Sequence, residues 1–199
     1  LGPNLMAVHM TQLKEDEIHL LSETGVHVIH CPESNLKLAS GFCPVAKLLD
    51  AGINVALGTD GAASNNDLDL MGEMRTAALL AKAVAQNASA LPAAKALTMA
   101  TLGGARALGI DDMVGSISAG KWADITAIQL DDFETQPLFN PISDLVYAAS
   151  RHQVTNVWIE GRRVLKDRRL TTLNESDIRT RVRIWRERLG SDRPSTNTH

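Results

Sequence analysis

Short apolar runs alternate with amphipathic segments through the first 110 residues. The apolar runs have the length and the β-branched content of strands, and they lie at 5–8, 26–30 and 53–57. The amphipathic segments have apolar residues at helical spacing, and they lie at 15–23, 45–51, 68–86 and 92–108. Gly25 and Gly52 follow the first two of these segments, where a helix C-cap glycine is found. This alternation predicts βα units and a parallel sheet.

The pattern changes after Gly109. Strand-like stretches at 123–130 and 154–160 are followed by a turn at 161–163 and a third stretch at 164–166, which predicts a hairpin outside the α/β region. A helix rich in arginine is expected at 176–189, with one solvated face and one packed apolar stripe made of Ile178, Val182, Trp185 and Leu189. The tail from Gly190 is polar, and we expect it to fray. We therefore divide the chain into segments 1–112, 113–173 and 174–199.

The chain has 199 residues, of which 44% are hydrophobic and 22% are charged, as in folded globular proteins. Its formal net charge of −3 provides no basic field for a phosphate backbone, so we expect no nucleic-acid partner. No apolar run reaches the length of about 18 residues that a membrane span needs, and residues 1–10 show no signal-peptide pattern. Two cysteines, Cys31 and Cys43, argue against a disulfide framework and favour a cytoplasmic protein.

His9, His30 and Asp60 lie at or just after the ends of the three predicted strands. Loops after such strand ends build the active sites of βα architectures. Each residue alone also has a structural explanation, because a histidine ending a strand is often a hydrogen-bonded core residue and Asp suits a GTDG turn. Together, imidazole and carboxylate suit a divalent cation that activates a water. A catalytic zinc usually takes at least three protein ligands, and the chain has neither HxH nor HExxH, so this set is incomplete.

Two polar segments near these residues have two interpretations each. Residues 60–66 are either a functional loop or a helix-capping loop, with Ser64, Asn65 or Asn66 as the cap. The segment 34–38 has the same ambiguity. We interpret four further polar residues as surface or packing residues, namely His19, Glu23, His27 and His152.

Five longer motifs connect the sequence to a known family. HCPESNLKLASG at 30–41 and LGTDGAASNNDLDL at 57–70 closely resemble segments of the amidohydrolase superfamily, in the clade of S-adenosylhomocysteine and methylthioadenosine deaminases. Triazine hydrolases and guanine deaminases are near relatives. MATLGGARALGI at 99–110 resembles the last barrel helix of that family, and GSISAGKWADITAI at 115–128 resembles its return to a small β-domain. VYAASRHQVTNVWIEGRRVL at 146–165 resembles its closing hairpin, so the resemblance covers nearly the whole chain.

The resemblance implies an α/β fold: the C-terminal part of a (β/α)₈ metal-dependent hydrolase barrel (a TIM barrel), with part of a flanking β-sandwich. Residues 5–9, 26–30 and 53–60 then correspond to barrel strands six, seven and eight. The family's HxH after the first strand, its fifth-strand histidine and the proton-shuttling Glu would all lie upstream of Leu1. The chain alone would accordingly be catalytically incomplete, with the N-terminal half of the same protein as its partner.

The same resemblance suggests a role for each candidate residue. Asp60 corresponds to the eighth-strand aspartate, a metal ligand that also takes a proton from the attacking water. His9 corresponds to the sixth-strand histidine, which hydrogen-bonds the attacking hydroxide or the developing alkoxide. His30, Ser34 and Asn35 correspond to the seventh-strand segment that lines the substrate pocket.

The function implied is that of an aminohydrolase: a metal-activated hydroxide replaces the amino group of an adenosine-type substrate, such as S-adenosylhomocysteine or methylthioadenosine. One divalent metal ion is expected, with zinc favoured and iron or manganese as alternatives. A related hydrolase of triazine or guanine-type rings is the first alternative function. A fragment without catalytic activity that folds only within an assembly is the second, and a homo-oligomer is left open.

Overall fold

A parallel three-stranded sheet forms the first part of the molecule, in the computed structural model that describes residues 1–191. Its strands are β1 (Met6–Val8), β2 (His27–His30) and β3 (Val55–Leu57), hydrogen-bonded in the order β1-β2-β3. All three residues of β3 are buried, as is usual for a parallel strand that is covered on both faces. The three predicted strands and their parallel pairing are thus confirmed.

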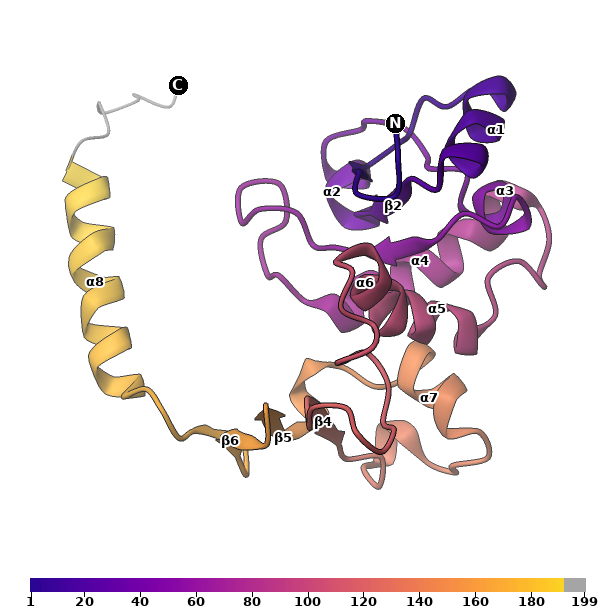
Figure 1. The fold of residues 1–199 in the computed structure, drawn as a ribbon. Helices are drawn as coiled ribbons and strands as arrows, with labels where there is room; N and C mark the ends of the chain where they lie inside the picture. Colours follow the sequence, from indigo (N-terminus) through magenta and orange to yellow (C-terminus); the bar gives the residue numbers. More distant parts are fainter. Residues whose placement is uncertain (192–199) are drawn as a thin grey trace.

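Helices connect these strands and pack against them (Figure 1). They are α1 (Glu15–Thr24), α2 (Pro32–Lys37), α3 (Val45–Asp50), α4 (Leu70–Ala85), α5 (Ala93–Ala100) and α6 (Leu102–Ala107). Gly25 ends α1 in the left-handed conformation, with φ of 69°, as predicted for a C-cap glycine. The small side chains of Ala77, Ala78 and Ala96 are completely buried, and they let α4 and α5 pack closely in the core.

The single helix predicted at 92–108 is wrong, because Thr101 divides it into α5 and α6. Its backbone has φ −128° and ψ −94°, outside the helical region, and its Oγ1 donates a hydrogen bond of 2.7 Å to the Leu97 carbonyl. The break turns α6 so that Gly103 meets β3: a Cβ at Gly103 would lie 2.9 Å from the Val55 carbonyl oxygen. Tertiary packing against the sheet therefore overrides the helical pattern.

An antiparallel sheet follows, with the order β4-β5-β6-β7. Its strands are β4 (Ile125–Ile128), β5 (Val154–Ile159), β6 (Arg162–Lys166) and β7 (Arg169–Leu170). The β5–β6 hairpin confirms the one predicted from the sequence, with Gly161 at φ 75° in its turn. Three short helical elements between β4 and β5 were not predicted: η1 (Phe133–Thr135), α7 (Pro141–Tyr147) and η2 (Arg151–Gln153).

The last helix, α8 (Glu175–Ser191), stands apart from the remainder of the chain (Figure 1). It confirms the helix predicted at 176–189, but the packed stripe predicted on it is wrong. Val182, Trp185 and Leu189 are each about 60% exposed, because no other element of the described chain covers them. Gly190 belongs to the helix, and the remainder of the predicted tail, 192–199, lies outside the described residues.

Candidate functional site

The carboxyl ends of β1, β2 and β3 bring the candidate residues together at one edge of the parallel sheet. His9 directly follows β1, His30 is the last residue of β2, and Asp60 lies shortly after β3. The register pairs His30 with Leu57, and the backbone N–H of His9 donates a 2.9 Å hydrogen bond to the Ile29 carbonyl. Parallel strands in this register place their following loops at the same edge, as the sequence predicted.

Asp60 is surrounded by hydrogen-bond donors. The hydroxyl groups of Ser64 and Ser34 donate to its Oδ2, over 2.6 and 2.7 Å, and the backbone N–H of Gly61 donates to its Oδ1 over 2.8 Å. These bonds, that of Ser64 first, lower the pKa of Asp60 to about 2, so the carboxyl group is ionised at neutral pH. Its backbone is left-handed, with φ of 60°, a conformation that Asp and Asn adopt more readily than other side-chain-bearing residues.

His9 lies between Asp60 and α2. Its Nδ1 lies 2.8 Å from Asn35 Oδ1 and its Nε2 lies 3.8 Å from Asp60 Oδ2. Since Asn35 Oδ1 is an acceptor, Nδ1 carries the proton of the neutral ring, and Nε2 presents a lone pair. Nε2 and Asp60 Oδ2 are then two acceptors that face each other, and a donor with two protons, such as a water molecule, can bond to both.

His30 and Asn35 are buried beneath this edge, with 1% and 2% of their surfaces exposed. His30 Nδ1 and Asn35 Nδ2 have no hydrogen-bond partner within the described residues. Burial, together with the nearby His9, lowers the pKa of His30 to about 4, so its ring is neutral at physiological pH. Buried polar atoms without partners are uncommon, and at a site they indicate groups that a ligand or water would satisfy.

The helix-capping interpretation of the two polar segments is wrong. Residues 34–38 are not a capping loop, because 34–37 belong to α2, and Pro32 occupies the helix's first turn. The cap predicted at Ser64, Asn65 or Asn66 is wrong: the N-cap of α4 is Asp69, whose Oδ1 accepts from the Met71 N–H over 3.0 Å.

The four residues interpreted as surface or packing residues lie away from Asp60 in ordinary contacts. His19 pairs with Glu23 on the exposed face of α1 over 3.2 Å, and His27 Nδ1 lies 3.0 Å from Asn54 Nδ2. His152 is exposed. These positions confirm the interpretation made from the sequence.

Behind the edge lies an acidic cluster that the sequence analysis missed. Glu73 of α4 is completely buried and accepts hydrogen bonds from the Glu33 N–H and from Asn65 Nδ2. Burial is the main reason that the pKa of Glu73 rises to about 7; the Glu33 and Asp67 carboxylates add to the rise, and the two hydrogen bonds oppose it. One signal was present in the sequence: Glu73 falls on the apolar stripe of α4, four residues before Ala77.

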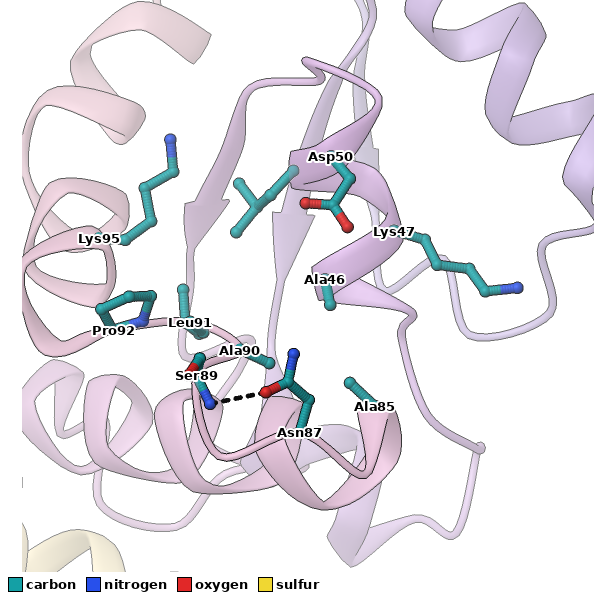
Figure 2. Close-up of a pocket in the computed structure, with 11 residues that line it drawn as sticks. Ala46, Lys47, Asp50, Ala85, Asn87, Ser89, Ala90, Leu91, Pro92 and Lys95 are labelled. Atoms are coloured by element: carbon teal, nitrogen blue, oxygen red, sulfur yellow. Dashed lines mark hydrogen bonds between the residues drawn. The ribbon is translucent and has the colours of Figure 1, made fainter.

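A hollow of about 600 Å³ lies on the helical side of the sheet, between α3 and the segment that joins α4 to α5 (Figure 2). Two of its polar side chains are engaged locally: Asn87 Oδ1 accepts from the Ser89 N–H over 2.9 Å, and Lys47 pairs with Glu15. The lining residues include no histidine or cysteine, and none of the candidate residues His9, His30 and Asp60 is among them. The edge with Asp60 remains the candidate site.

The residues of this edge fit a divalent cation in part. The ionised Asp60 carboxylate and the neutral imidazoles are ligand types that zinc takes. Within residues 1–191, however, no three His, Cys, Asp or Glu side chains form a group that could hold a metal ion. Asp60 therefore fits as one ligand of a metal ion, and that ion would need further ligands, as the sequence analysis also concluded.

Parallel strands with outer helices, and polar side chains at the strands' carboxyl edge, define this part of the molecule as an arc of a (β/α) barrel. The chain belongs to the amidohydrolase family, whose sequence profile matches residues 1–164. This membership confirms the resemblance and the fold class predicted from the motifs. The fold is mixed α/β: a partial barrel plus an antiparallel sheet.

Two curated relatives in this family are deaminases. The chain is 52% identical to 5-methylthioadenosine/S-adenosylhomocysteine deaminase of Teredinibacter turnerae, over 97% of this chain and 44% of that protein. It is 51% identical to 5'-deoxyadenosine deaminase of Methanothermobacter thermautotrophicus, over 89% of this chain and 41% of that protein. The chain thus spans less than half the length of these relatives.

Two solved structures of proteins with related activities are also similar to this chain. An adenosine deaminase from Xanthomonas campestris with bound zinc has a TM-score of 0.94 and 57% identity, over 96% of this chain and 43% of that chain. Atrazine chlorohydrolase TrzN from Arthrobacter aurescens, complexed with zinc, has a TM-score of 0.87 and 28% identity, over 92% of this chain and 41% of that one. Both of these similar proteins bind zinc. No helix among residues 1–191 has the length and apolarity needed to span a membrane.

Proposed function

We propose that this chain is part of a longer zinc-dependent aminohydrolase that deaminates an adenosine-type nucleoside, such as S-adenosylhomocysteine or methylthioadenosine. One observation carries the proposal: an ionised Asp60 carboxylate, held by Ser34 and Ser64, faces the His9 ring at the carboxyl edge of the sheet. Identity of about 50% with deaminases of this substrate class supports it.

Asp60 would be one ligand of the metal, and the other ligands would come from residues outside these 199. When bound, the metal would lower the pKa of a water molecule towards 7 and so supply a nucleophile at neutral pH. Zinc is favoured because the similar deaminase structure holds it; iron and manganese are alternatives of the same ligand chemistry. In this proposal residues 1–112 are the barrel part, 113–173 a portion of a β-sandwich, and 174–199 a terminal helix and tail.

The chain's own side chains orient the nucleophile and the substrate. Nε2 of His9 and Oδ2 of Asp60 would accept protons of the attacking water, and Asp60 would then hold the proton that the water gives up. His30, Ser34 and Asn35 would face the substrate; the buried Nδ1 of His30 and Nδ2 of Asn35 each have a hydrogen bond left to make with a ligand or a water. The ring carbon would gain the water oxygen while an acid outside these residues protonates the ring nitrogen; the amino group would then take the proton held by Asp60 and leave as ammonia, and the new hydroxyl group would return its proton to the external acid.

The test substitutes Asp60 by Asn in the natural protein at its full length. Asn tolerates the left-handed backbone but cannot take the proton, so deamination should fall by at least about 100-fold and the zinc content should drop. Asp67→Asn is the matched control, because Asp67 lies in the same loop and pairs with Arg151 at the surface over 3.1 Å. It should keep deamination within a few-fold of the unchanged protein. Full deamination in Asp60→Asn would remove Asp60 from the mechanism.

Hydrolysis of a triazine or guanine-type ring is the second candidate, favoured by the structural similarity to TrzN. A panel of adenosine, guanine and triazine substrates, assayed by release of ammonia or chloride, separates the two. We expect turnover with the adenosine-type substrates. If only the triazine or the guanine is turned over, the second candidate replaces the first.

We also propose a cytoplasmic location for the protein. Both cysteines are free and buried, which is typical of proteins in a reducing compartment. Fractionation of cells that express the natural protein tests this location.

A further inference from the structure

Among residues 1–190, Glu73 is the only carboxyl side chain that is completely removed from solvent. Its position behind the site gives it no access to a substrate at the carboxyl edge. An ionisable group in such a place costs folding free energy unless its hydrogen bonds offset the burial, so its contacts indicate what it does.

The two oxygens of Glu73 bond to two different segments. Oε2 accepts from the backbone N–H of Glu33, in the first turn of α2, over 3.1 Å. Oε1 accepts from Asn65 Nδ2, in the loop that follows β3, over 2.5 Å. These two segments come from the ends of neighbouring strands, and Glu73 joins them from α4.

Each of these partners adjoins a residue that holds Asp60. Glu33 precedes Ser34 in α2, and Asn65 follows Ser64 in the loop; the hydroxyl groups of both serines donate to Asp60 Oδ2. Asn65 also orders its own loop, because its Oδ1 accepts from the backbone N–H groups of residues 67 and 68 over 3.1 and 2.9 Å. A shift of either segment away from Glu73 would therefore move a hydroxyl group away from Asp60.

Further contacts of Glu33 add to this connection. A Cβ at Gly72 would lie 3.2 Å from Glu33 Oε1, so the Glu33 side chain lies directly against the backbone of α4. Thr76 Oγ1 donates to the same Glu33 oxygen over 2.9 Å. Asn65 Nδ2 also lies 3.4 Å from Glu33 Oε2, so the two carboxyl groups share one amide.

We propose that Glu73 is a positioning residue for the deamination: it joins α2 to the loop of residues 60–69 and thereby sets both serine hydroxyl groups on Asp60. This inference rests on the proposed function for its catalytic consequence. The structural connection itself is independent of the reaction. Nothing in the roles assigned above involves Glu73, since it touches neither Asp60 nor the open edge.

The test compares Glu73→Gln with Met74→Ala in the natural protein at its full length. Gln has one acceptor oxygen where Glu has two, so the Glu33 N–H or Asn65 Nδ2 loses its partner. Met74 is the adjacent core residue of α4, 3% exposed, and its truncation destabilises the same helix without removing a hydrogen bond to α2 or the loop. Two quantities are measured: kcat and KM for deamination well below the unfolding temperature, and amide hydrogen exchange of residues 31–38 and 60–69.

We expect Glu73→Gln to lower kcat by roughly 10- to 100-fold, as loss of a supporting hydrogen bond does, with a smaller change in KM. Exchange in both segments should quicken by about 10-fold or more. Met74→Ala should lower the unfolding temperature and leave kcat and both exchange rates near those of the unchanged protein. If Met74→Ala lowers kcat as much as Glu73→Gln, or if exchange in the two segments is unaltered in Glu73→Gln, the inference is overturned.

The two measurements also separate this inference from the proposed function. If the unchanged protein deaminates no adenosine-type substrate, the proposed function fails, and hydrogen exchange alone decides whether Glu73 joins the two segments. If the unchanged protein is active and exchange does not respond to Glu73→Gln, the proposed function stands and the inference fails.

Discussion

Two adjacent glycines of α6, Gly103 and Gly104, have opposite surroundings, and substituting each by alanine tests how α6 packs on the sheet. A Cβ at Gly103 would lie 2.9 Å from the Val55 carbonyl oxygen and 3.1 Å from that of Thr98. Both atoms belong to the backbone and cannot rotate away. A Cβ at Gly104 would meet no atom within 4 Å. The perturbation is one methyl group in each case.

The expected effects have opposite signs. In Gly103→Ala, β3 and α6 must separate by some tenths of an ångström, and such overpacking lowers the unfolding free energy by about 1–3 kcal/mol. The separation also lengthens the 3.0 Å bond from Asn54 Nδ2 to the Gly103 carbonyl. In Gly104→Ala the unfolded chain loses conformational freedom and no clash follows, so the unfolding free energy rises by about 0.5–1 kcal/mol.

Thermal unfolding of both variants, followed by circular dichroism, provides the assay. With roughly 2–4 °C per kcal/mol for a domain of about 150–250 residues, the midpoints should differ by about 3–16 °C, with Gly104→Ala the higher. The unchanged protein should lie between the two variants. If Gly103→Ala unfolds at the same temperature as Gly104→Ala, or above it, α6 does not pack on β3 as described.

Three further predictions follow from groups described above. Burial raises the pKa of Glu73 from 4.5 to about 7, so the folded protein holds this proton more firmly than the unfolded chain does. The unfolding free energy should therefore fall by on the order of 3 kcal/mol as the pH rises from 4.5 through 7. Urea titrations at several pH values should show this dependence on pH, and it should be weaker in Glu73→Gln. Burial raises the pKa values of Cys31 and Cys43 to about 11 and 12. Both thiols should therefore react with a disulfide reagent at pH 7 only as fast as the protein unfolds. Rapid labelling of the native protein would contradict their burial. Arg75 Nη2 donates a hydrogen bond to the carbonyl of Ala149, just after α7. Arg75→Ala should therefore lower the unfolding free energy by about 1–3 kcal/mol and make α7 more accessible to proteases. Limited digestion would detect the second effect.

Local patterns predicted the strands and most of the helices. Apolar runs bounded by glycine are short-range signals, and β2 and β3 lie within the stretches expected for them. The site could be anticipated for a related reason. Consecutive βα units place their strand ends at one edge, so His9, His30 and Asp60 converge without any long-range information.

What the sequence could not predict depends on tertiary contacts. The segment of α2 is short and polar, typical of a turn, and its helix is supported by Glu73 bonding to the Glu33 N–H. The break at Thr101 arises where α6 turns towards β3, which no local pattern shows. The amphipathic pattern of α8 gives a helix with an apolar stripe, but a pattern does not say whether an element of the same chain covers that stripe.

The left-handed backbone of Asp60 has a consequence for how this position can change during evolution. At φ of 60° most side chains cost about 1–2 kcal/mol, and Gly, Asn, Asp and His adopt it more readily than the others, as His9 does here at φ 71°. Glu is the other anionic ligand of divalent cations, but it would carry this backbone cost, whereas Gly, Asn and His would not supply an anionic ligand. Two separate requirements, one of conformation and one of charge, thus admit the same single residue. Substitutions that alter the reaction should therefore accumulate around Asp60, and Asp60 itself should stay unchanged.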